Sequence, residues 1–337
     1  MPDGRAMRYA VQAMDERAIR FLIFAGFGVA SLWAGYFARK HEWIREEVSR
    51  AVHWHTVVWV WSLVSMISLW RAPLGQGDMW LVLISLLTVA GAAFAVIPMA
   101  KALGCTREQV GVLSVAAGGG NLGFTMGAYI CYSLLDHGEI ALGIAIAFVS
   151  AMQVFSIILL YPVARHFSPR EASDMSLPRL IITSIFDVRS MPLFAAVAGQ
   201  LLGILGPEAP KQLGTWHIID ALFYLGSFGG YFGIGLRLRL GGSLLGFARP
   251  HAILAVIKFV FLPVLSWVLL WLIARTVGCQ CDGHEVVMIE AFMPTAIQTV
   301  MIANLFHLDT RLASAIWLWN TVFFLVGPML LILWWWQ

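Results

Sequence analysis

Charged side chains are scarce in this sequence: Asp, Glu, Lys and Arg make up 12% of its 337 residues, whereas 60% of the residues are hydrophobic. A soluble domain usually carries about a quarter charged residues, and its surface-to-volume ratio would leave much of this apolar surface in water. The composition therefore excludes a soluble globular protein and predicts a chain whose solvent is a lipid bilayer. The net charge of +3 and the scattered basic residues also exclude nucleic acid as a partner.

Cysteines and chemical motifs are few as well. Cys279 and Cys281 form a C-x-C pair followed by His284, but a structural zinc site needs four ligands, so no metal is predicted. The sequence has no H-E-x-x-H, G-x-S-x-G or nucleotide-binding motif. These absences predict that the chain is not an enzyme and has no resident cofactor. Residues 1–17 are polar and lack a signal-peptide pattern, so we expect the first membrane helix to direct insertion.

Long apolar runs fill most of the chain. A spanning helix needs roughly 20 mostly apolar residues, and continuous runs of this length favour helices over the alternating strands of a membrane barrel. The sequence therefore predicts an all-α membrane protein with ten transmembrane helices. The predicted stretches are 18–38, 51–70, 79–103, 109–135, 139–163, 190–206, 216–236, 250–274, 285–306 and 312–336.

The distribution of charge divides the chain into two halves. The longest polar segment separates an amino-terminal repeat (1–165) from a carboxy-terminal repeat (190–337) through a cytoplasmic linker (166–189). Loops on the side opposite the amino terminus hold fourteen Lys and Arg residues against seven on the other side, which predicts that both termini are non-cytoplasmic. Five helices per half is an odd number, so two similar halves would form inverted repeats, an architecture of secondary transporters.

The fourth stretch contains a cluster of glycines around an asparagine. Four glycines and Asn121 fall within the segment Gly118–Gly123, and glycine costs about 1 kcal/mol relative to alanine inside a helix. We expect the helix to break here, with Asn121 supplying donors and an acceptor to the exposed backbone. The alternative is tight helix packing through small residues.

The ninth stretch contains Pro294, which removes a backbone donor and clashes with the carbonyl of Glu290. A second helix break is therefore expected. Glu290, Pro294 and Gln298 are spaced by four and would share one helix face. An ionisable group within a membrane helix is costly and usually functional, so Glu290 is the candidate proton-responsive group. The alternative is that Glu290 lies at the membrane edge and pairs with a neighbour.

The two predicted breaks occupy matching positions, each in the fourth helix of its half. Broken helices at matching positions indicate a binding site near the membrane midplane, and their amino-terminal ends attract anions. Lys258, within the eighth stretch, would either extend to the interface or face the cavity and attract an anion, and we favour the cavity. Glu290 and Lys258 are thus the predicted coupling or gating residues. Coupling to H⁺ through Glu290 is preferred, with Na⁺ as the alternative.

Four short motifs resemble the auxin efflux carrier family, within the bile-acid, auxin and arsenite transporter superfamily. Asn121–Phe124 resembles its N-x-G-F signature and Met293–Ala296 its M-P-x-A signature. Ile257–Pro263 is similar to the lysine-and-proline eighth helix of the family, and Gly233–Leu236 to its small-residue seventh helix. The resemblance implies two inverted repeats of five helices, two crossover helices that meet at the substrate site, and small organic anions as substrates. The substrate-binding residues that it implies are Gly119, Gly120, Asn121, Gly123, Pro294, Thr295 and Gln298.

Together these features predict a secondary active transporter that moves a small organic anion by alternating access. The expected location is the plasma membrane or bacterial inner membrane, with the lipid bilayer and the anion as partners and a homodimer left open. The alternative function is a non-transporting membrane sensor or assembly subunit that retains the transporter fold.

Overall fold

The computed structural model describes residues 23–24, 26–71, 79–123, 126–135, 138–169, 179, 182–183, 185–216, 218–238, 247–277 and 283–335. Within these residues the regular structure is helical, and a single isolated bridge pairs Gly120 with Thr295. The all-α prediction is therefore confirmed. Half of the predicted linker 166–189 lies outside the described residues, as do Cys279, Cys281 and the first residues of the predicted stretch 18–38.

The helices follow one another along the chain with short connections. Residues 26–40 are helical. The elements that follow are α2 (Val48–His55), η1 (Thr56–Trp61), α3 (Ser62–Arg71), α4 (Met79–Ala102), α5 (Arg107–Gly118), α6 (Gly127–Leu134), α7 (Gly138–Phe155), η3 (Ser156–Leu160), α8 (Tyr161–Phe167), η4 (Val188–Ser190), α10 (Met191–Leu205), α11 (Gln212–Thr215), α12 (Ile218–Gly235), α13 (Ala248–Val256), η6 (Ile257–Phe261), α14 (Leu262–Val277), α15 (His284–Ala291), α16 (Ile297–Leu305), α17 (Thr310–Val326) and α18 (Pro328–Trp335).

Seven helical segments in the described part of the chain are long and apolar enough to cross a bilayer. They are Val48–Arg71, Trp80–Ala102, Ala147–Phe167, Val188–Leu205, Ile218–Gly235, Ala248–Thr276 and Thr310–Trp335. The predicted stretches 109–135 and 285–306 are absent from this set because each consists of two short helices separated by non-helical backbone. The length and apolarity of these segments indicate an integral membrane protein. The ten membrane spans arranged as inverted repeats remain a prediction.

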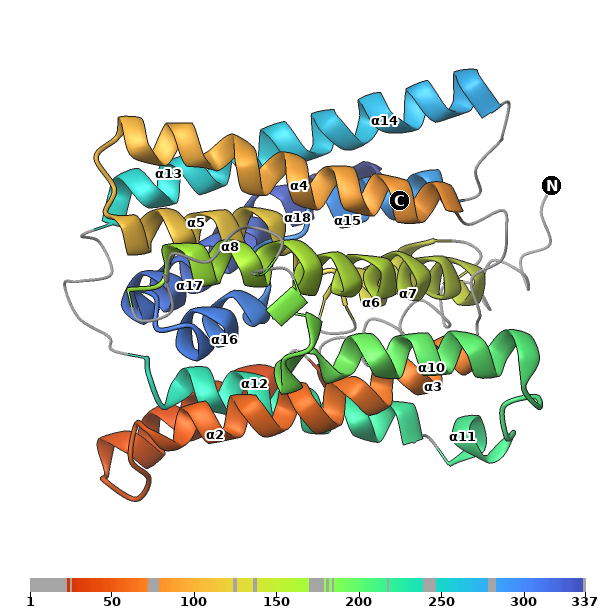
Figure 1. The fold of residues 1–337 in the computed structure, drawn as a ribbon, viewed down its shortest axis with the longest axis horizontal. Coiled ribbons are helices and arrows are strands. Elements are labelled where there is room, and N and C mark those ends of the chain that lie inside the picture. Colours follow the sequence, from red (N-terminus) through yellow and green to blue (C-terminus); the bar gives the residue numbers. More distant parts are fainter. Residues whose placement is uncertain are drawn as a thin grey trace.

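The helices form two groups with the short helices between them. Figure 1 shows α2, α3, α10 and α12 along one long side of the molecule and α4, α13 and α14 along the opposite side. Contacts between α3 and α10 and between α2 and α12 hold the first group together, and α4 contacts both α5 and α14 in the second. The short helices α5, α6, α15 and α16 therefore lie in the interior of the bundle, where the two helix breaks occur.

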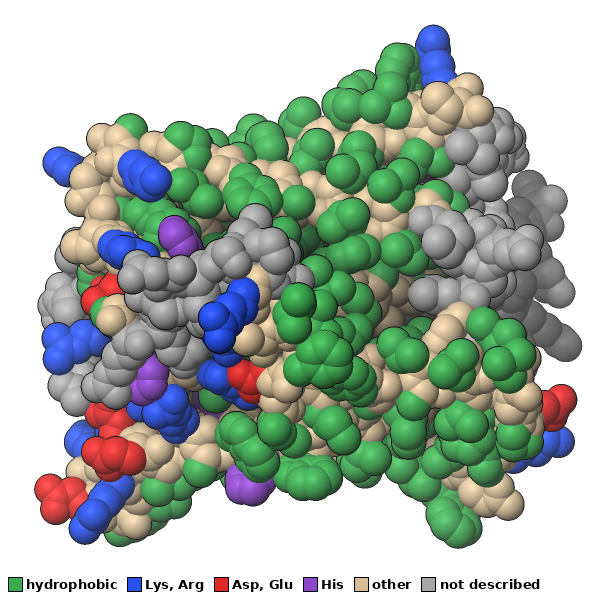
Figure 2. Space-filling view, viewed as in Figure 1, with side chains coloured by type: hydrophobic (Ala, Val, Ile, Leu, Met, Phe, Trp, Pro, Cys, Tyr) green, Lys and Arg blue, Asp and Glu red, His purple; other side chains and the backbone are tan. Residues whose placement is uncertain are grey.

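The outer surface has the pattern of a protein embedded in lipid. Figure 2 shows hydrophobic side chains across the middle of the visible face, with Lys, Arg, Asp and Glu gathered toward its two ends. Large apolar side chains such as Trp267, Trp271 and Leu331 are exposed. A soluble monomer rarely exposes apolar surface on this scale, so a bilayer is the solvent that fits this face.

Close contact between α3 and α10 depends on a glycine. A Cβ atom added at Gly199 of α10 would collide with the backbone carbonyl of Met66 on α3. Small residues let membrane helices approach until their backbones touch. Gly199 therefore sets the distance between the two helices.

Replacing Gly199 with Ala is expected to destabilise the protein by about 1–3 kcal/mol, the usual cost of overpacking a tight contact. The melting temperature of the purified protein in detergent, followed by circular dichroism, would fall by several degrees. Gly26→Ala is the matched control, because an added Cβ at Gly26 meets nothing within 4 Å. Equal melting temperatures for the two variants would show that the α3–α10 contact is looser than the structure indicates.

Candidate functional site

The first helix break lies at the predicted glycine cluster. Helix α5 begins with a capping box, in which Thr106 and Gln109 satisfy each other's backbone donors, and it ends at Gly118. Gly119 then adopts an extended conformation, with φ −91° and ψ 115°. Helix formation resumes at Gly127 as α6. The prediction that the backbone unwinds at these glycines is confirmed.

The second helix break lies at Pro294. Helix α15 ends at Ala291 and α16 begins at Ile297, so the intervening residues are non-helical. The expectation that Glu290, Pro294 and Gln298 share one helix face is wrong. The break separates them, since Glu290 lies in α15 and Gln298 in α16.

The two breaks cross and hydrogen bond to each other. The backbone N–H of Asn121 donates to the carbonyl of Pro294 at 2.7 Å, and the N–H of Ala296 donates to the carbonyl of Gly119 at 3.2 Å. Gly120 and Thr295 face each other as an antiparallel bridge. Each extended segment thus supplies the partners that the other lost when its helix ended, as buried backbone groups require.

Two polar side chains from long helices brace this crossing. Lys258, in the π-helical segment η6, donates from Nζ to the carbonyl of Gly119 at 2.8 Å. The Asn320 Oδ1 atom of α17 accepts from the backbone N–H of Thr295 at 2.7 Å. Both side chains are buried. Sequence reasoning missed Asn320, although an amide in the middle of an apolar helix is a signal that could have identified it.

A small cavity adjoins the crossing. Its volume is about 20 Å³, and its lining includes Gly120, Lys258 and Glu290. This space is sufficient for roughly one water molecule. The Glu290 side chain is 1% exposed, and its two carboxylate oxygens have no hydrogen-bond partner among the described residues. The structure therefore places Glu290 in the protein interior, and Lys258 faces the cavity rather than the interface.

Gly127, the first residue of α6, adjoins the Glu290 carboxylate. A Cβ atom added at Gly127 would collide with this carboxylate and with the carbonyl of Leu122. The two halves of the chain thus meet a second time, through a side chain of α15 and the first turn of α6. Any larger residue at position 127 would displace the acidic group from the cavity.

The remaining predicted residues divide between the crossing and its surroundings. Asn121 is buried, and its side chain lies near Tyr231 of α12. Gln298 is half-buried and lies near Tyr161 of α8, and Gly123 is also half-buried. The residues that the structure brings together at the crossing are Gly119, Gly120, Asn121, Pro294 and Thr295. Gly123 and Gln298 line neither the crossing nor the cavity.

Arginines surround the carboxyl end of α16. The Leu305 carbonyl accepts from Arg189 Nη1 at 3.2 Å and from Arg50 Nη2 at 3.3 Å, which suits the negative end of a helix dipole. The guanidinium carbons of Arg165 and Arg189 lie 5.4 Å and 4.4 Å from the centre of the Phe306 ring, within cation–π range. The carboxyl end of α16, the helix that follows the second break, is thus held by basic side chains from α2, α8 and η4.

Asp187 holds two of these arginines. Its Oδ2 atom pairs with Arg165 Nη2 at 3.0 Å, and its Oδ1 accepts from Arg189 Nε at 2.8 Å. Burial acts to raise the pKa of the Asp187 carboxyl, but the hydrogen bonds and charge of Arg189, together with the charge of Arg165, outweigh burial and lower the pKa below its usual value. The charged carboxylate therefore contributes to stability.

The Asp187 contribution should depend on pH. The pKa of Asp187 is lower in the folded state than in the unfolded state. The full stabilisation of the folded protein by the charged carboxylate is therefore present at pH values above the unfolded pKa of about 4. This stabilisation is lost as the pH falls through the pKa of Asp187 in the folded protein. Asp187→Asn should therefore lower the melting temperature at pH 7 and have a diminishing effect below about pH 4. The control is Glu208→Gln, which removes one exposed carboxylate. A destabilisation by Asp187→Asn that is the same at pH 3 and pH 7 would contradict this account.

Comparison with models of known protein families gives a match in the carboxy-terminal part of the chain. The model of the family described as "Membrane transport protein" matches residues 211–333. The matched region runs from α11 to α18 and contains Lys258, the second helix break and Asn320. No curated protein matches the chain in sequence.

Proposed function

We propose that this chain, which residues 211–333 identify with the auxin efflux carrier family of membrane transport proteins, moves a small organic anion across the membrane by alternating access. One observation carries this proposal: the two broken helices cross in the protein interior, beside a cavity that holds both an ammonium and a carboxylate group. Broken helices that meet at such a point are how many secondary transporters build their substrate sites.

Several features favour an anion as the substrate. The Lys258 ammonium group lines the cavity, and its positive charge would attract an anion. Helices α6 and α16 both begin beside the crossing, and helix amino termini favour negative charge. The predicted substrate-binding residues at the crossing, Asn121 and Thr295, would add polar contacts.

The position of Glu290 suggests proton coupling. A carboxylate and a bound anion in one small cavity would repel each other, so anion binding favours the protonated carboxyl group. The same linkage means that a proton on Glu290 favours the anion. Because each of the two ligands strengthens binding of the other, the proton and the anion would bind and cross the membrane together. Na⁺ coordinated by carbonyl groups of the broken helices is the alternative coupling ion.

The size of the cavity requires a conformational change. A volume of about 20 Å³ cannot hold an organic acid, so the substrate site must widen toward one side of the membrane at a time. We take this arrangement as the closed one. In the proposed architecture, ten spans form inverted repeats in residues 1–165 and 190–337, with both termini outside the cytoplasm of a plasma or bacterial inner membrane.

Transport of an organic acid tests the proposal directly. A thermal-shift screen of the purified protein against organic acids should find ligands that raise its melting temperature, and these should be imported into proteoliposomes that contain the protein. Lys258→Met should reduce import at least tenfold, because the anion loses its positive partner. Lys101→Met, which changes an exposed lysine at the end of α4, is the control. The proposal fails if no acid is imported, or if Lys258→Met transports as well as the control.

Glu290→Gln should abolish the pH dependence of uptake while the protein still folds, because an amide resembles the protonated carboxyl but cannot release a proton. Uptake would be measured at several external pH values, together with proton movement reported by a pH-sensitive dye inside the vesicles. Glu285→Gln is the matched control, since Glu285 is exposed on the same helix. Transport with an unchanged pH dependence would remove Glu290 from the coupling mechanism.

A further inference from the structure

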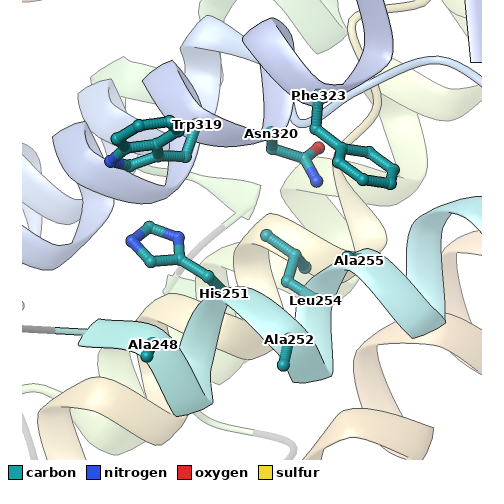
Figure 3. A pocket seen from close by; sticks show the side chains of 8 residues that line it. All are labelled: Ala248, His251, Ala252, Leu254, Ala255, Trp319, Asn320 and Phe323. Atoms are coloured by element: carbon teal, nitrogen blue, oxygen red, sulfur yellow. The ribbon is translucent and has the colours of Figure 1, made fainter. Parts of the chain in front are cut away.

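A second, larger pocket lies between α13 and α17, away from the small cavity. Its volume is about 320 Å³, which is within the range of small-molecule sites. Figure 3 shows side chains from the two helices facing each other across it. Among the described residues, none lines both this pocket and the cavity that holds Lys258 and Glu290. The lining of the larger pocket includes His251, Ala252, Ala255, Trp319, Asn320 and Phe323.

The walls of this pocket are apolar and partly aromatic. Ala252 and Ala255 lie three residues apart on α13, so both face the same side of the helix, and their small side chains leave the space open. Trp319 and Phe323 form the opposite wall from α17 and are 40% and 53% exposed. Both helices belong to membrane-spanning segments, so the pocket is accessible to molecules that dissolve in the bilayer.

Two polar side chains, Asn320 and His251, line this otherwise apolar pocket. The Asn320 side chain is 5% exposed, and Figure 3 shows its amide nitrogen directed toward the pocket. Its oxygen is occupied by the backbone N–H of Thr295. No other hydrogen bond of Asn320 is formed among the described residues. An acceptor oxygen within the pocket would therefore pair with this nitrogen.

Asn320 also connects the pocket to the crossing of the broken helices. Its oxygen accepts from Thr295, and Thr295 faces Gly120 in the bridge between the two breaks. A ligand that orders the Asn320 amide would therefore also order the hydrogen bond to Thr295. The pocket and the crossing are linked through a single side chain.

We propose that this pocket binds a neutral molecule that partitions into the membrane, with a compact apolar body and one hydrogen-bond acceptor oxygen, such as a ketone, ester or amide. The oxygen accepts from the Asn320 Nδ2 atom, and the apolar body fills the space between the alanines of α13 and the rings of α17. A neutral ligand is specified because the described lining residues include no Lys, Arg, Asp or Glu, and His251 is the one titratable side chain among them. The site is thus distinct in position and in ligand charge from the proposed anion site.

Two probes of the same shape test the role of Asn320. Acetophenone has a carbonyl group where α-methylstyrene has a methylene group. Binding of each radiolabelled probe would be measured on the protein in lipid nanodiscs, with empty nanodiscs as the blank for partitioning. We expect saturable binding, roughly fivefold tighter for acetophenone, as one ordinary hydrogen bond provides. Binding that does not saturate above the blank, or equal affinity for the two probes, would overturn the proposal without any variant being needed.

Variants of α13 locate the binding site. Ala252→Phe would fill the pocket and should weaken binding of both probes at least tenfold. Val256→Phe places the same ring on an exposed position of the same helix outside the pocket and should leave binding unchanged. Unchanged binding in a folded Ala252→Phe variant would show that the probes bind elsewhere.

Hydrogen exchange measures the connection to the crossing independently of transport. Acetophenone should slow exchange in peptides that cover residues 292–298, because the Thr295 amide donates to Asn320, whereas α-methylstyrene should have a smaller effect. Equal protection by both probes would contradict a connection through Asn320. These binding results do not depend on whether an organic acid is transported, so failure of the transport proposal leaves them interpretable.

Discussion

Buried backbone groups must find hydrogen-bond partners, and in this protein that constraint is met by joining two segments that lie far apart in the sequence. Each break exposes N–H and C=O groups that a continuous helix would have paired, and each unsatisfied group would cost roughly 1–3 kcal/mol. The segments at Gly119–Asn121 and Pro294–Ala296 satisfy one another instead. The positions of Lys258 and Asn320 follow from this crossing, because each bonds to one of the two segments.

The side chains of Lys258 and Asn320 also pair with backbone groups that the helix breaks expose. One donates to a carbonyl on the first segment, and the other accepts from an amide on the second. Both come from long helices that cross the bilayer, so the crossing is attached to the rigid part of the bundle. A movement that opens the small cavity has to preserve these hydrogen bonds or replace them with bonds to the substrate.

Glu290 is the exception to this pairing. Its carboxylate is buried against Gly127 and lines the same cavity as Lys258, yet no described residue donates to it. A buried ionisable group without a partner is expensive to keep charged, and such groups within membrane segments are usually functional. Proton exchange coupled to an anion is the use that fits a carboxyl group beside an ammonium group in so small a space.

Composition determined that this is a membrane protein, because a chain with so few charged residues would leave too much apolar surface in water, and the long continuous apolar runs determined that it is helical. The sequence also located both helix breaks, since glycine and proline act on the backbone locally, and it identified Lys258 and Glu290 as costly groups within apolar segments. Only the tertiary structure decided that the two breaks hydrogen bond to each other, that Gln298 is separated from Glu290, and that Asn320 braces Thr295. In helices that are apolar on every side, the sequence carries little information on which face meets a neighbour and which meets lipid, so these pairings depended on packing between distant segments.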